Sequence, residues 1–488
     1  MASLEEIRQE RLKKISLLNE AGMNPYPASG PSSSTILTIR ESFADLVKTG
    51  EEVSISGRIM SMRGQGGLIF LDLNDGTGTF QALLKADNLD EASFDLFENT
   101  VDIGDFIHVT GLLFTTKTGA ETIEIKSWLM LAKSLRPLPD KWHGLKDEEE
   151  RLRRRYLDIL TNKETRDIVE KRAIFWSSLR EFLTKQGFLE VDTPVLENIA
   201  GGAEAEPFVT HHKALDLDLY LRISPELWLK RLMVAGLPKV FEIGRIFRNE
   251  GMDAEHLQDY TQVEWYWAYS DYHDGMKLVR DMYQYVAEAT FGTTKFNIKD
   301  FEIDLAGDWA TYDYVETIVE KTGLNVLTAS FEELETKIKA LGIKYDSKGF
   351  NKNRAVDTLW KYCRRQIAGP GFLVGVPVFM EPLAKRNADN PEIVERFQVI
   401  LAGSEMGKGF SELNDPIDQA SRFADQVKLR EAGDKEAQMN DTDFVEAMEY
   451  GMPPCSGFGV SERLFSFLFN KTIRETQIFP LMKPKDKD

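Results

Sequence analysis

Three clusters of charged, aromatic and small residues have the types and spacing to bind and transform a polar ligand. The first is FRNEGMDAEHLQDYTQVEW (247–265), in which Arg248 and Glu250 alternate on one expected strand. Glu264 and the following Tyr266 alternate on a second expected strand. Alternate residues of a strand share one face, and burying such groups is costly unless a polar partner binds them. The cluster predicts a polar-ligand site, with surface ion pairs as an equally weighted alternative.

The other two clusters combine charged residues with glycines. In SEMGKGFSELND (404–415), Glu405 and Glu412 flank two glycines, where a backbone can approach a ligand closely. Two carboxylates near an arginine can hold Mg²⁺ or a cationic substrate group. In GMPPCSGFGVSERLFSFLF (451–469), small residues lead into an expected helix that begins with Glu462 and Arg463. The alternatives are an exposed acidic hairpin and a packed strand–helix junction. The sequence contains no Walker loop, dinucleotide fingerprint, H-E-x-x-H or nucleophile elbow.

The N-terminal part of the chain predicts a small β-domain. Residues 3–22 predict a charged helix, and residues 24–34 form a linker rich in Pro, Gly and Ser. Five short strands follow, separated by Gly or Asp turns, namely VSISGRIMSMR, GLIFLDLND, GTFQALL, DFIHVTGLLF and ETIEIKSWLML. They predict a closed barrel of the oligonucleotide-binding type, with a β-sandwich as the alternative.

The remainder of the chain predicts a mixed domain. LRPLPDKWHG (135–144) indicates a connector, and KDEEERLRRRYLD (146–158) indicates a solvated helix or, alternatively, a contact to ligand phosphates. A helical stripe over 168–183 ends at Gly187. Strand-like segments lie at 218–224, 239–250, 260–269, 372–380 and 395–403, without the regular alternation of a doubly wound fold. We therefore expect a large antiparallel sheet with flanking helices, and a helical insertion at about 325–371.

Composition narrows the functional classes. Lys and Arg number 60 against 79 Asp and Glu, a net charge of −19 that argues against indiscriminate nucleic-acid binding. No apolar run is long enough for a membrane span, and the charged N-terminus lacks a signal peptide's apolar stretch. The two cysteines exclude a disulfide framework and a cysteine-based zinc site, and they fit a cytoplasmic protein.

With these motifs in view, the sequence resembles the class II aminoacyl-tRNA synthetases, specifically the bacterial-type lysyl-tRNA synthetases. GFLEVDTP (187–194), FRNEG (247–251) through VEW, and GFGVSERL (457–464) are similar to the three motifs of the class. The long segments 135–158, 201–232 and 409–415 resemble the lysine-specific members. The resemblance implies an α+β multidomain protein, in which a five-stranded OB-fold β-barrel precedes a class II synthetase catalytic domain built on an antiparallel β-sheet flanked by helices.

The resemblance also implies domain boundaries. Residues 1–50 would form the N-terminal helix and linker, 51–134 the anticodon-binding OB-fold, 135–164 a connector and 165–488 the catalytic domain. The first motif, about 165–194, would form a homodimer. The substrates would be L-lysine, ATP and tRNA(Lys), with Mg²⁺ as cofactor.

The resemblance assigns roles residue by residue. Arg248 would grip the α-phosphate and the lysine carboxylate, Glu250 the adenine amino group, and Tyr260 the adenine ring. His256 and Arg463 would reach the outer phosphates, which makes Arg248 and Arg463 the expected catalytic residues. The expected lysine-binding residues are Gly202, Glu226, Arg248, Glu264, Tyr266, Phe410 and Glu412, with Tyr266 and Glu412 at the far ammonium. The expected metal ligands are Glu405 and Glu412, together with Gln398, whose neutral amide stands where the family has a carboxylate.

In the barrel, the resemblance assigns the anticodon contacts to Arg63, Phe70 and Gln81. Phe70 would stack on a base, whereas from LIFLDL alone a barrel-core residue is the favoured interpretation. The stretch 201–232 contains no further assigned role.

Five features depart from the family pattern. Gln398 stands where the family has Glu, Lys408 where it has Asn, and Glu255 where it has Arg. The third motif is one residue shorter between Gly459 and Arg463, and Trp128 stands where an acidic base-reading residue is expected. These departures leave open the number of metal ions, the phosphate contacts and the details of anticodon readout.

The sequence thus predicts attachment of lysine to its tRNA through a lysyl-adenylate. One alternative is an asparaginyl- or aspartyl-type enzyme, against which GFSELND and the Glu264/Tyr266 pair argue. The other is a non-catalytic RNA-binding paralogue, which Gln398 and Glu255 alone support.

Overall fold

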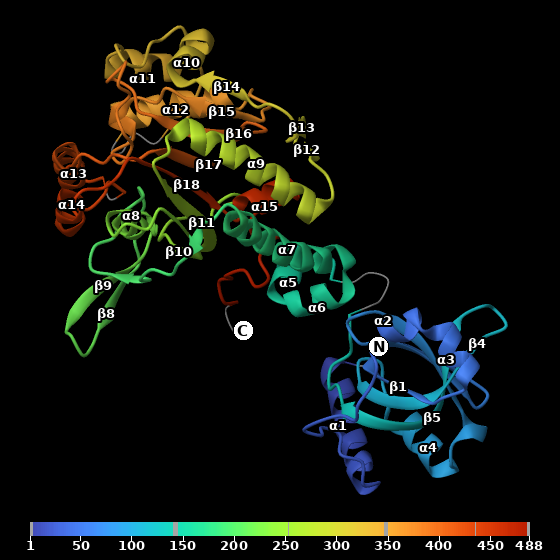
Figure 1. Cartoon of the computed structure of the whole chain (residues 1–488). Coiled ribbons are helices and arrows are strands. Elements are labelled where there is room, and N and C mark those ends of the chain that lie inside the picture. Colours follow the sequence, from blue (N-terminus) through green and yellow to red (C-terminus); the bar gives the residue numbers. More distant parts are fainter. Residues whose placement is uncertain (1–2, 140–144, 252, 346–349, 435, 486–488) are drawn as a thin grey trace. The chain divides into compact units, whose positions relative to one another are not determined.

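The computed structural model describes residues 3–139, 145–251, 253–345, 350–434 and 436–485 (Figure 1). The chain divides into two compact units, Met1–Thr161 and Asn162–Asp488. Residues 140–144 of the expected connector and residues 346–349 of the expected insertion lie outside the described residues. Within the described ranges, none of the helices combines the length and the apolar character needed to cross a bilayer.

The first unit is built around a closed five-stranded barrel, as predicted. Its strands are β1 (Val53–Gln65), β2 (Leu68–Asn74), β3 (Thr79–Lys85), β4 (Phe106–Thr115) and β5 (Glu121–Ala132), and they close in the order β1-β2-β3-β5-β4. Alternate residues of each strand fill the interior, as Ile69, Leu71 and Leu73 do on β2. Closure leaves the sheet without free edges, so the sandwich alternative is wrong.

Four α-helices and a 3-10 turn surround the barrel. They are α1 (Leu4–Glu20), α2 (Ile36–Glu41), α3 (Phe43–Thr49), η1 (Ala86–Asn88) and α4 (Glu91–Thr100). The predicted helix α1 begins with a capping box in which Ser3 and Glu6 satisfy each other's backbone N–H groups. The sequence did not predict α4, which packs on the barrel where the Phe97 ring meets Trp128 edge-on at 5.0 Å.

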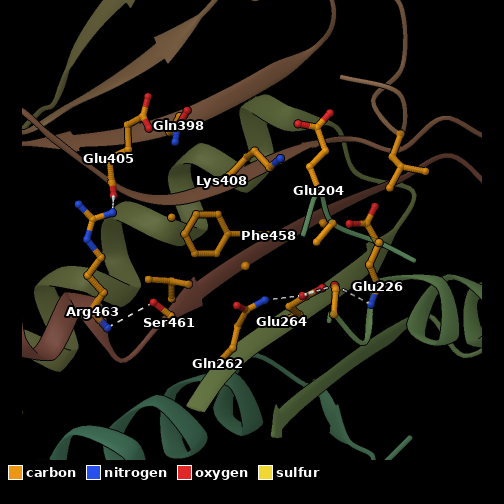
Figure 2. A pocket seen from close by; sticks show the side chains of 18 of the residues that line it. Glu204, Glu226, Gln262, Glu264, Gln398, Glu405, Lys408, Phe458, Ser461 and Arg463 are labelled. Carbon is orange, nitrogen blue, oxygen red and sulfur yellow. Dashed lines mark hydrogen bonds between the residues drawn. The ribbon is translucent and has the colours of Figure 1, made fainter. Parts of the chain in front are cut away.

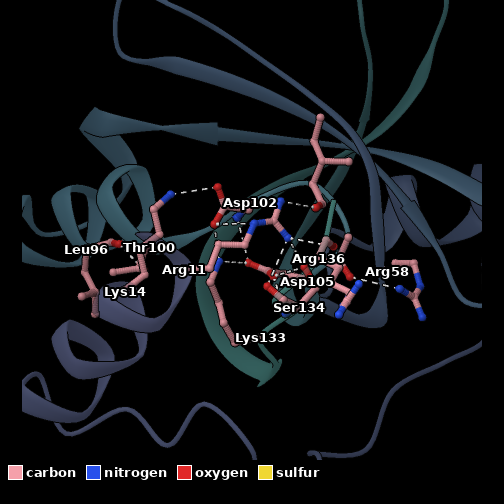
Figure 3. Close-up of polar contacts among 12 residues, drawn as sticks. Arg11, Lys14, Arg58, Leu96, Thr100, Asp102, Asp105, Lys133, Ser134 and Arg136 are labelled. Carbon is pink, nitrogen blue, oxygen red and sulfur yellow. Dashed lines mark hydrogen bonds and ion pairs between the residues drawn. The ribbon is translucent and has the colours of Figure 1, made fainter. Parts of the chain in front are cut away.

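A buried polar cluster fixes α1 to the barrel (Figure 3). The ammonium of Lys133 lies 2.7 Å from Asp105, and both side chains are fully buried. Arg11 of α1 donates to the carbonyls of Ser134 and Ile103 at 3.1 Å, and Lys14 pairs with Asp102 at 2.8 Å. Because buried charges are costly without partners, this arrangement holds α1 in one position on the barrel.

The acidic and then basic run 146–158 forms two short helices, α5 (Glu148–Arg153) and α6 (Arg155–Thr161). It is not simply a solvated face, because Leu152, Arg155 and Asp158 are buried. Arg155 pairs with Asp158 at 2.8 Å. The alternative of a contact to ligand phosphates stays a prediction.

The second unit is organised around an eight-stranded sheet, as expected for the fold class. Its order is β14-β15-β16-β17-β18-β11-β10-β6, and all pairs are antiparallel except β14 with β15 and β10 with β6. The strands are β6 (Leu189–Glu190), β10 (Lys239–Phe247), β11 (Asp259–Ala268), β14 (Ala310–Asp313), β15 (Gly371–Val374), β16 (Arg396–Leu401), β17 (Ser404–Ser411) and β18 (Cys455–Ser461).

Helices cover one face of this sheet. The predicted helix α7 (Lys163–Lys185) and α9 (Tyr272–Phe291) bury their apolar stripes in a core that also contains Val263, Trp265 and Phe397 from the strands (Figure 1). The further helices are α8 (Glu226–Val234), α10 (Tyr314–Thr322), α11 (Phe331–Ala340), α12 (Lys352–Arg364), α13 (Pro416–Glu431), α14 (Thr442–Glu449) and α15 (Arg463–Leu468). Helices α11 and α12 of the expected insertion share a second core with strand residues such as Phe410.

Three strand predictions need correction. Residues 218–224 contribute β9 (Leu217–Leu221) to a separate three-stranded sheet with β7 (Leu196–Glu197) and β8 (Val209–His212). In 372–380 the strand ends at Val374, because Gly375 has a φ of +73° and Pro377 follows, and a 3-10 turn η2 (Val378–Met380) replaces the rest. The strand 239–250 ends at Phe247, so Arg248 and Glu250 do not alternate on it. A small hairpin of β12 (Lys295–Ile298) and β13 (Phe301–Asp304) completes the unit.

Candidate active site

A cavity of about 430 Å³ lies on the sheet face that α7 and α9 do not cover. Figure 2 shows part of its lining. Strand β11 shows how the sequence builds it. Gln262, Glu264 and Tyr266 line the cavity, while the intervening Val263 and Trp265 lie in the core. All of the residues predicted for the catalytic domain line this one cavity, namely Gly202, Glu226, Arg248, Glu250, His256, Tyr260, Glu264, Tyr266, Gln398, Glu405, Phe410, Glu412 and Arg463.

Arg248 and Glu250 reach the cavity from a loop instead of a strand. The backbone N–H of Arg248 donates to the carbonyl of Gln258 at 2.7 Å, which closes the loop base beside β11. The Arg248 guanidinium donates weakly to the Ile223 carbonyl at 3.4 Å and lies 5.7 Å from the Tyr260 ring centre. Burial raises the pKa of Tyr260, so this ring stays neutral. A cation and an aromatic face therefore stand side by side at the cavity wall.

The acidic end of the cavity consists of Glu226, Glu264, Tyr266 and Glu412. Glu264 accepts hydrogen bonds from Ser224 at 2.7 Å and from Tyr266 at 3.0 Å. Burial, with Glu226 as a neighbouring charge, raises the pKa of Glu264 to about 7. A cation that binds beside such a carboxyl group favours its ionised form.

Gly202 lets the backbone approach this acidic end. Its φ is +83°, and a Cβ there would lie 2.9 Å from Cβ of Glu226 and 3.0 Å from Oγ of Ser224. Any side chain would therefore be strained and would crowd both residues. The glycine leaves its backbone polar groups open to a ligand.

Lys230, one helical turn after Glu226 on α8, is a residue at the acidic end that the sequence did not predict. Its ammonium lies 2.7 Å from Glu226 and 2.5 Å from Glu412, and it is fully buried. It also lies 5.2 Å from the ring centre of Phe410. The i,i+4 spacing of Glu and Lys in ELWLK was the available signal, but on most helices that spacing marks a solvated pair.

The opposite side of the cavity contains Glu405 and Arg463 (Figure 2). We call it the cationic end. Arg463, the first residue of α15, donates to the backbone carbonyl of Glu405 at 3.3 Å and contacts the carboxylate of Glu255. His256 lies on the exposed loop and pairs with Asp253 at 2.8 Å. A second cation, Lys299, lies 3.5 Å from Glu255.

Trp360 and Arg364, which the sequence did not predict at the site, hold Glu405 in place. Its Oε1 accepts a hydrogen bond from the indole of Trp360 at 2.6 Å, and Arg364 lies 3.9 Å away. Both come from the 325–371 segment, in which no motif was readable. Burial alone would raise the pKa of Glu405, but Arg364 and Arg396 outweigh it and lower that pKa, so the carboxylate stays ionised.

The residues at the cationic end fit one protein-bound metal contact, not a dedicated metal cage. Among the described residues no group of three or more His, Cys, Asp or Glu is placed to hold a metal ion. The Gln398 amide accepts from Arg396, and Arg396 pairs with Glu381 at 3.1 Å. Glu405 is therefore the available carboxylate, and an ion there needs further oxygens from a ligand or water.

Lys408 faces the cavity directly opposite Gln398 in the β16–β17 register. Its ammonium lies 3.3 Å from Glu381, and its side chain is 46% exposed. Lys408 thus borders the cavity while part of its side chain stays exposed to solvent. A contact between Lys408 and a phosphate stays a prediction.

In the first unit, Arg63, Phe70 and Gln81 lie on the outer face of the barrel. Phe70 pairs with Arg63 across β1 and β2, and the Arg63 guanidinium lies 5.6 Å from its ring centre. The ring is absent from the barrel core, whose β2 members are Ile69, Leu71 and Leu73. The core interpretation of Phe70 is therefore wrong. Trp128, by contrast, is buried and donates to the Ser93 carbonyl at 3.3 Å.

Comparisons with known proteins agree with both units. The family described as tRNA synthetases class II (D, K and N) matches residues 147–483, and the OB-fold nucleic acid binding domain matches residues 53–131. A lysine--tRNA ligase of Thermotoga maritima is 43% identical over 488 residues, covering 99% of this chain and 97% of the relative. Lysine--tRNA ligases of Roseiflexus sp. and Pelotomaculum thermopropionicum are 42% and 43% identical, over 99% of this chain and 100% and 96% of theirs.

Proposed function

The chain belongs to the class II tRNA synthetases and attaches lysine to tRNA, and we propose that the cavity of the second unit forms lysyl-adenylate from lysine and ATP. The observation that carries this proposal is the pairing of two opposite chemistries in one cavity. The acidic end suits ammonium groups, while Arg248 and Arg463 suit a carboxylate and phosphates.

Lysine binds at the acidic end. Glu226, Glu264 and the backbone at Gly202 receive the α-ammonium, and Tyr266 and Glu412 receive the far ammonium, with Phe410 beside the side chain. Glu412 is only 1% exposed, and Lys230 pairs with one of its oxygens, so a neutral side chain in the ligand would leave the other oxygen buried without a cation. This penalty discriminates strongly against uncharged amino acids.

ATP binds between the loop and the cationic end. Tyr260 stacks on the adenine, Glu250 accepts a hydrogen bond from its amino group, and Arg463 with His256 holds the outer phosphates. Arg248 holds the lysine carboxylate beside the α-phosphate. A carboxylate oxygen then attacks the α-phosphorus, the bond to pyrophosphate breaks, and Arg248 stabilises the charge on the phosphoryl oxygens.

Glu405 is the residue that would hold a magnesium ion carried by ATP. A Mg²⁺ ion bound there supplies charge neutralisation to the phosphate oxygens. We assign Glu412 to the substrate instead of to a metal, because the Lys230 ammonium already lies 2.5 Å from it. Gln398 is neutral and engaged by Arg396, so it adds no charge to the metal site.

The tRNA contacts both units. The exposed faces of Arg63, Phe70 and Gln81 bind the anticodon bases by stacking and hydrogen bonds. In the second step, a terminal ribose hydroxyl of the tRNA attacks the carbonyl carbon of the adenylate, and AMP leaves. A cytoplasmic location fits this substrate and the two buried free cysteines.

We further propose a homodimer through the first motif, about 165–194. Leu189 of β6 is 53% exposed at the end of the sheet, and Ile174 of α7 is 42% exposed. Large apolar side chains left open on an edge strand favour pairing with a second copy.

Lysine-dependent exchange of pyrophosphate into ATP, followed by aminoacylation of tRNA(Lys), tests the proposed chemistry. Exchange should require lysine and should not occur with aspartate or asparagine. Lysine-independent exchange, or exchange with another amino acid alone, would overturn the assignment of the acidic end.

A further inference from the structure

Lys230 is a buried cation directly behind the acidic end, and it does not line the cavity. It contacts Glu226 and Glu412, the two carboxylates assigned to opposite ends of the lysine substrate. Burial opposes its charge, but the two carboxylates outweigh burial and raise the pKa of Lys230. Its ammonium is therefore charged whenever the protein is folded.

We propose that Lys230 is a specificity-determining residue, an internal counter-cation that sets the charge of the pocket to match an amino acid with two ammonium groups. Three carboxylates line the acidic end, from Glu226, Glu264 and Glu412. Burial raises the pKa values of Glu264 and Glu412, and an ammonium ligand favours their ionised forms. When all three are ionised, the ammonium of Lys230 behind them leaves two negative charges. The two ammonium groups of lysine balance these charges, and Arg248 balances the lysine carboxylate. The inference rests on the lysine pocket proposed above.

Geometry separates the two cations that share Glu412. The Lys230 ammonium lies 2.5 Å from Oε2 as an ion pair. Both oxygens of Glu412 are buried, and neither has a hydrogen-bond partner among the described residues. Gly457 leaves space beside Oε1, since a Cβ there would lie 2.2 Å from it. Lys230 thus occupies one carboxylate oxygen and turns the other towards the ligand. Without Lys230, three carboxylates would repel one another, and one would take up a proton.

This role predicts effects of opposite sign in two backgrounds. In the otherwise unchanged enzyme, Lys230→Met should raise the lysine KM by about tenfold, because Glu412 loses its orientation and neighbouring carboxylates repel. In Glu412→Gln, the Lys230 ammonium no longer faces a carboxylate there and repels the far ammonium of the ligand. Adding Lys230→Met to Glu412→Gln should therefore lower the lysine KM.

The experiment measures lysine and ATP KM values in pyrophosphate exchange for Lys230→Met, Glu412→Gln and the double variant, with the lysine-induced shift in Tm as a second readout. The ATP KM should stay within about twofold throughout. Arg231→Met is the matched control, since Arg231 is the next residue of α8 but pairs with Asp441 at 2.9 Å outside the cavity. It should leave the lysine KM unchanged.

The outcomes distinguish failure of the counter-cation role of Lys230 from failure of the proposed lysine pocket. A double variant with a higher lysine KM than Glu412→Gln would overturn the counter-cation role, because a merely structural lysine worsens both backgrounds. If Lys230→Met does not fold, the comparison of the double variant with Glu412→Gln is sufficient to test the counter-cation role. If Glu412→Gln itself leaves the lysine KM unchanged, the proposed pocket fails, and the inference fails with it.

Discussion

The carboxylate of Glu255 contacts the guanidinium of Arg463, the residue to which we assign the outer phosphates of ATP. Glu255 lies on the loop between β10 and β11, and Lys299 lies 3.5 Å from its other oxygen. This carboxylate thus occupies the position in which a phosphate would neutralise Arg463.

Glu255→Gln should lower the ATP KM several-fold, because the phosphates would no longer compete with, or be repelled by, a carboxylate at Arg463. The lysine KM should hardly change. Pyrophosphate-exchange kinetics at fixed lysine concentration measure both. Asp259→Asn is a matched control, since Asp259 pairs with Arg245 at the base of the same loop but does not line the cavity. An unchanged or higher ATP KM for Glu255→Gln would show that the pair only supports Arg463.

Phe70→Ala should slow aminoacylation of tRNA(Lys) while leaving lysine-dependent pyrophosphate exchange near normal. The ring lies on the outer face of the barrel, and loss of one stacked base costs roughly 1–3 kcal/mol. Its neighbour Ile69 points into the core, so Ile69→Ala should instead lower the Tm. Truncating a buried isoleucine to alanine lowers the free energy of unfolding by about 2–5 kcal/mol. If Phe70→Ala lowers the Tm as Ile69→Ala does, or if both assays fall together, the anticodon role is not supported.

Leu189→Asp should convert the protein to a monomer if the first motif forms the dimer. Leu189 is exposed in the single chain, so folding should be little affected, whereas a carboxylate buried in an apolar interface would be unpaired. Sedimentation velocity reports the mass. Leu215→Asp provides the comparison, because Leu215 is also exposed, at 66%, but lies outside the first motif. A wild-type protein that sediments as a monomer would contradict the proposal directly.

The barrel and the cavity-lining residues of the short motifs could be predicted from the sequence, because strand alternation and short motifs carry that information locally. LIFLDL alone could not decide whether Phe70 lies inside or outside, since every residue of it except Asp72 is apolar. The β1–β2 register, in which Phe70 pairs with Arg63, places the ring outside. Trp360 could not be predicted at the site, because it acts on Glu405 from a helix 45 positions earlier in the chain. Nor could the end of β10 at Phe247, which depends on pairing with Asp259.

The affinity for lysine should rise between about pH 6 and pH 8. Folding raises the pKa of Glu264 from 4.5 to about 7, so the group is mostly neutral at pH 6 and mostly a carboxylate at pH 8. An ammonium ligand prefers the carboxylate. The same shift makes the unliganded protein lose stability as pH rises from 4.5 to 7.

The lysine-induced shift in Tm, measured against unliganded protein at each pH, should therefore be larger at pH 8 than at pH 6. Glu264→Gln should remove this difference. Glu204→Gln is the control, because desolvation in the cavity and nearby Glu381 also raise the pKa of Glu204 to about 7, but we assign it no lysine contact. If Glu204→Gln abolishes the pH dependence and Glu264→Gln preserves it, the carboxyl group whose titration controls lysine binding is that of Glu204 and not that of Glu264.

Gln398→Glu should strengthen divalent-cation binding at the cationic end. Gln398 pairs with Lys408 across β16 and β17, and Ile400 two residues later pairs with Glu405. A carboxylate at 398 would thus stand near that of Glu405 and offer a second charged oxygen ligand. Arg396, which now donates to the Gln398 amide, would compete for that carboxylate and limit the gain.

Mn²⁺ binding to Gln398→Glu in the presence of ATP, followed by electron paramagnetic resonance, should tighten several-fold, whereas Glu405→Gln should weaken it. Equal Mn²⁺ affinities for Gln398→Glu and the unchanged protein would mean that Arg396 and Lys408, not the missing carboxylate, set the charge at this end.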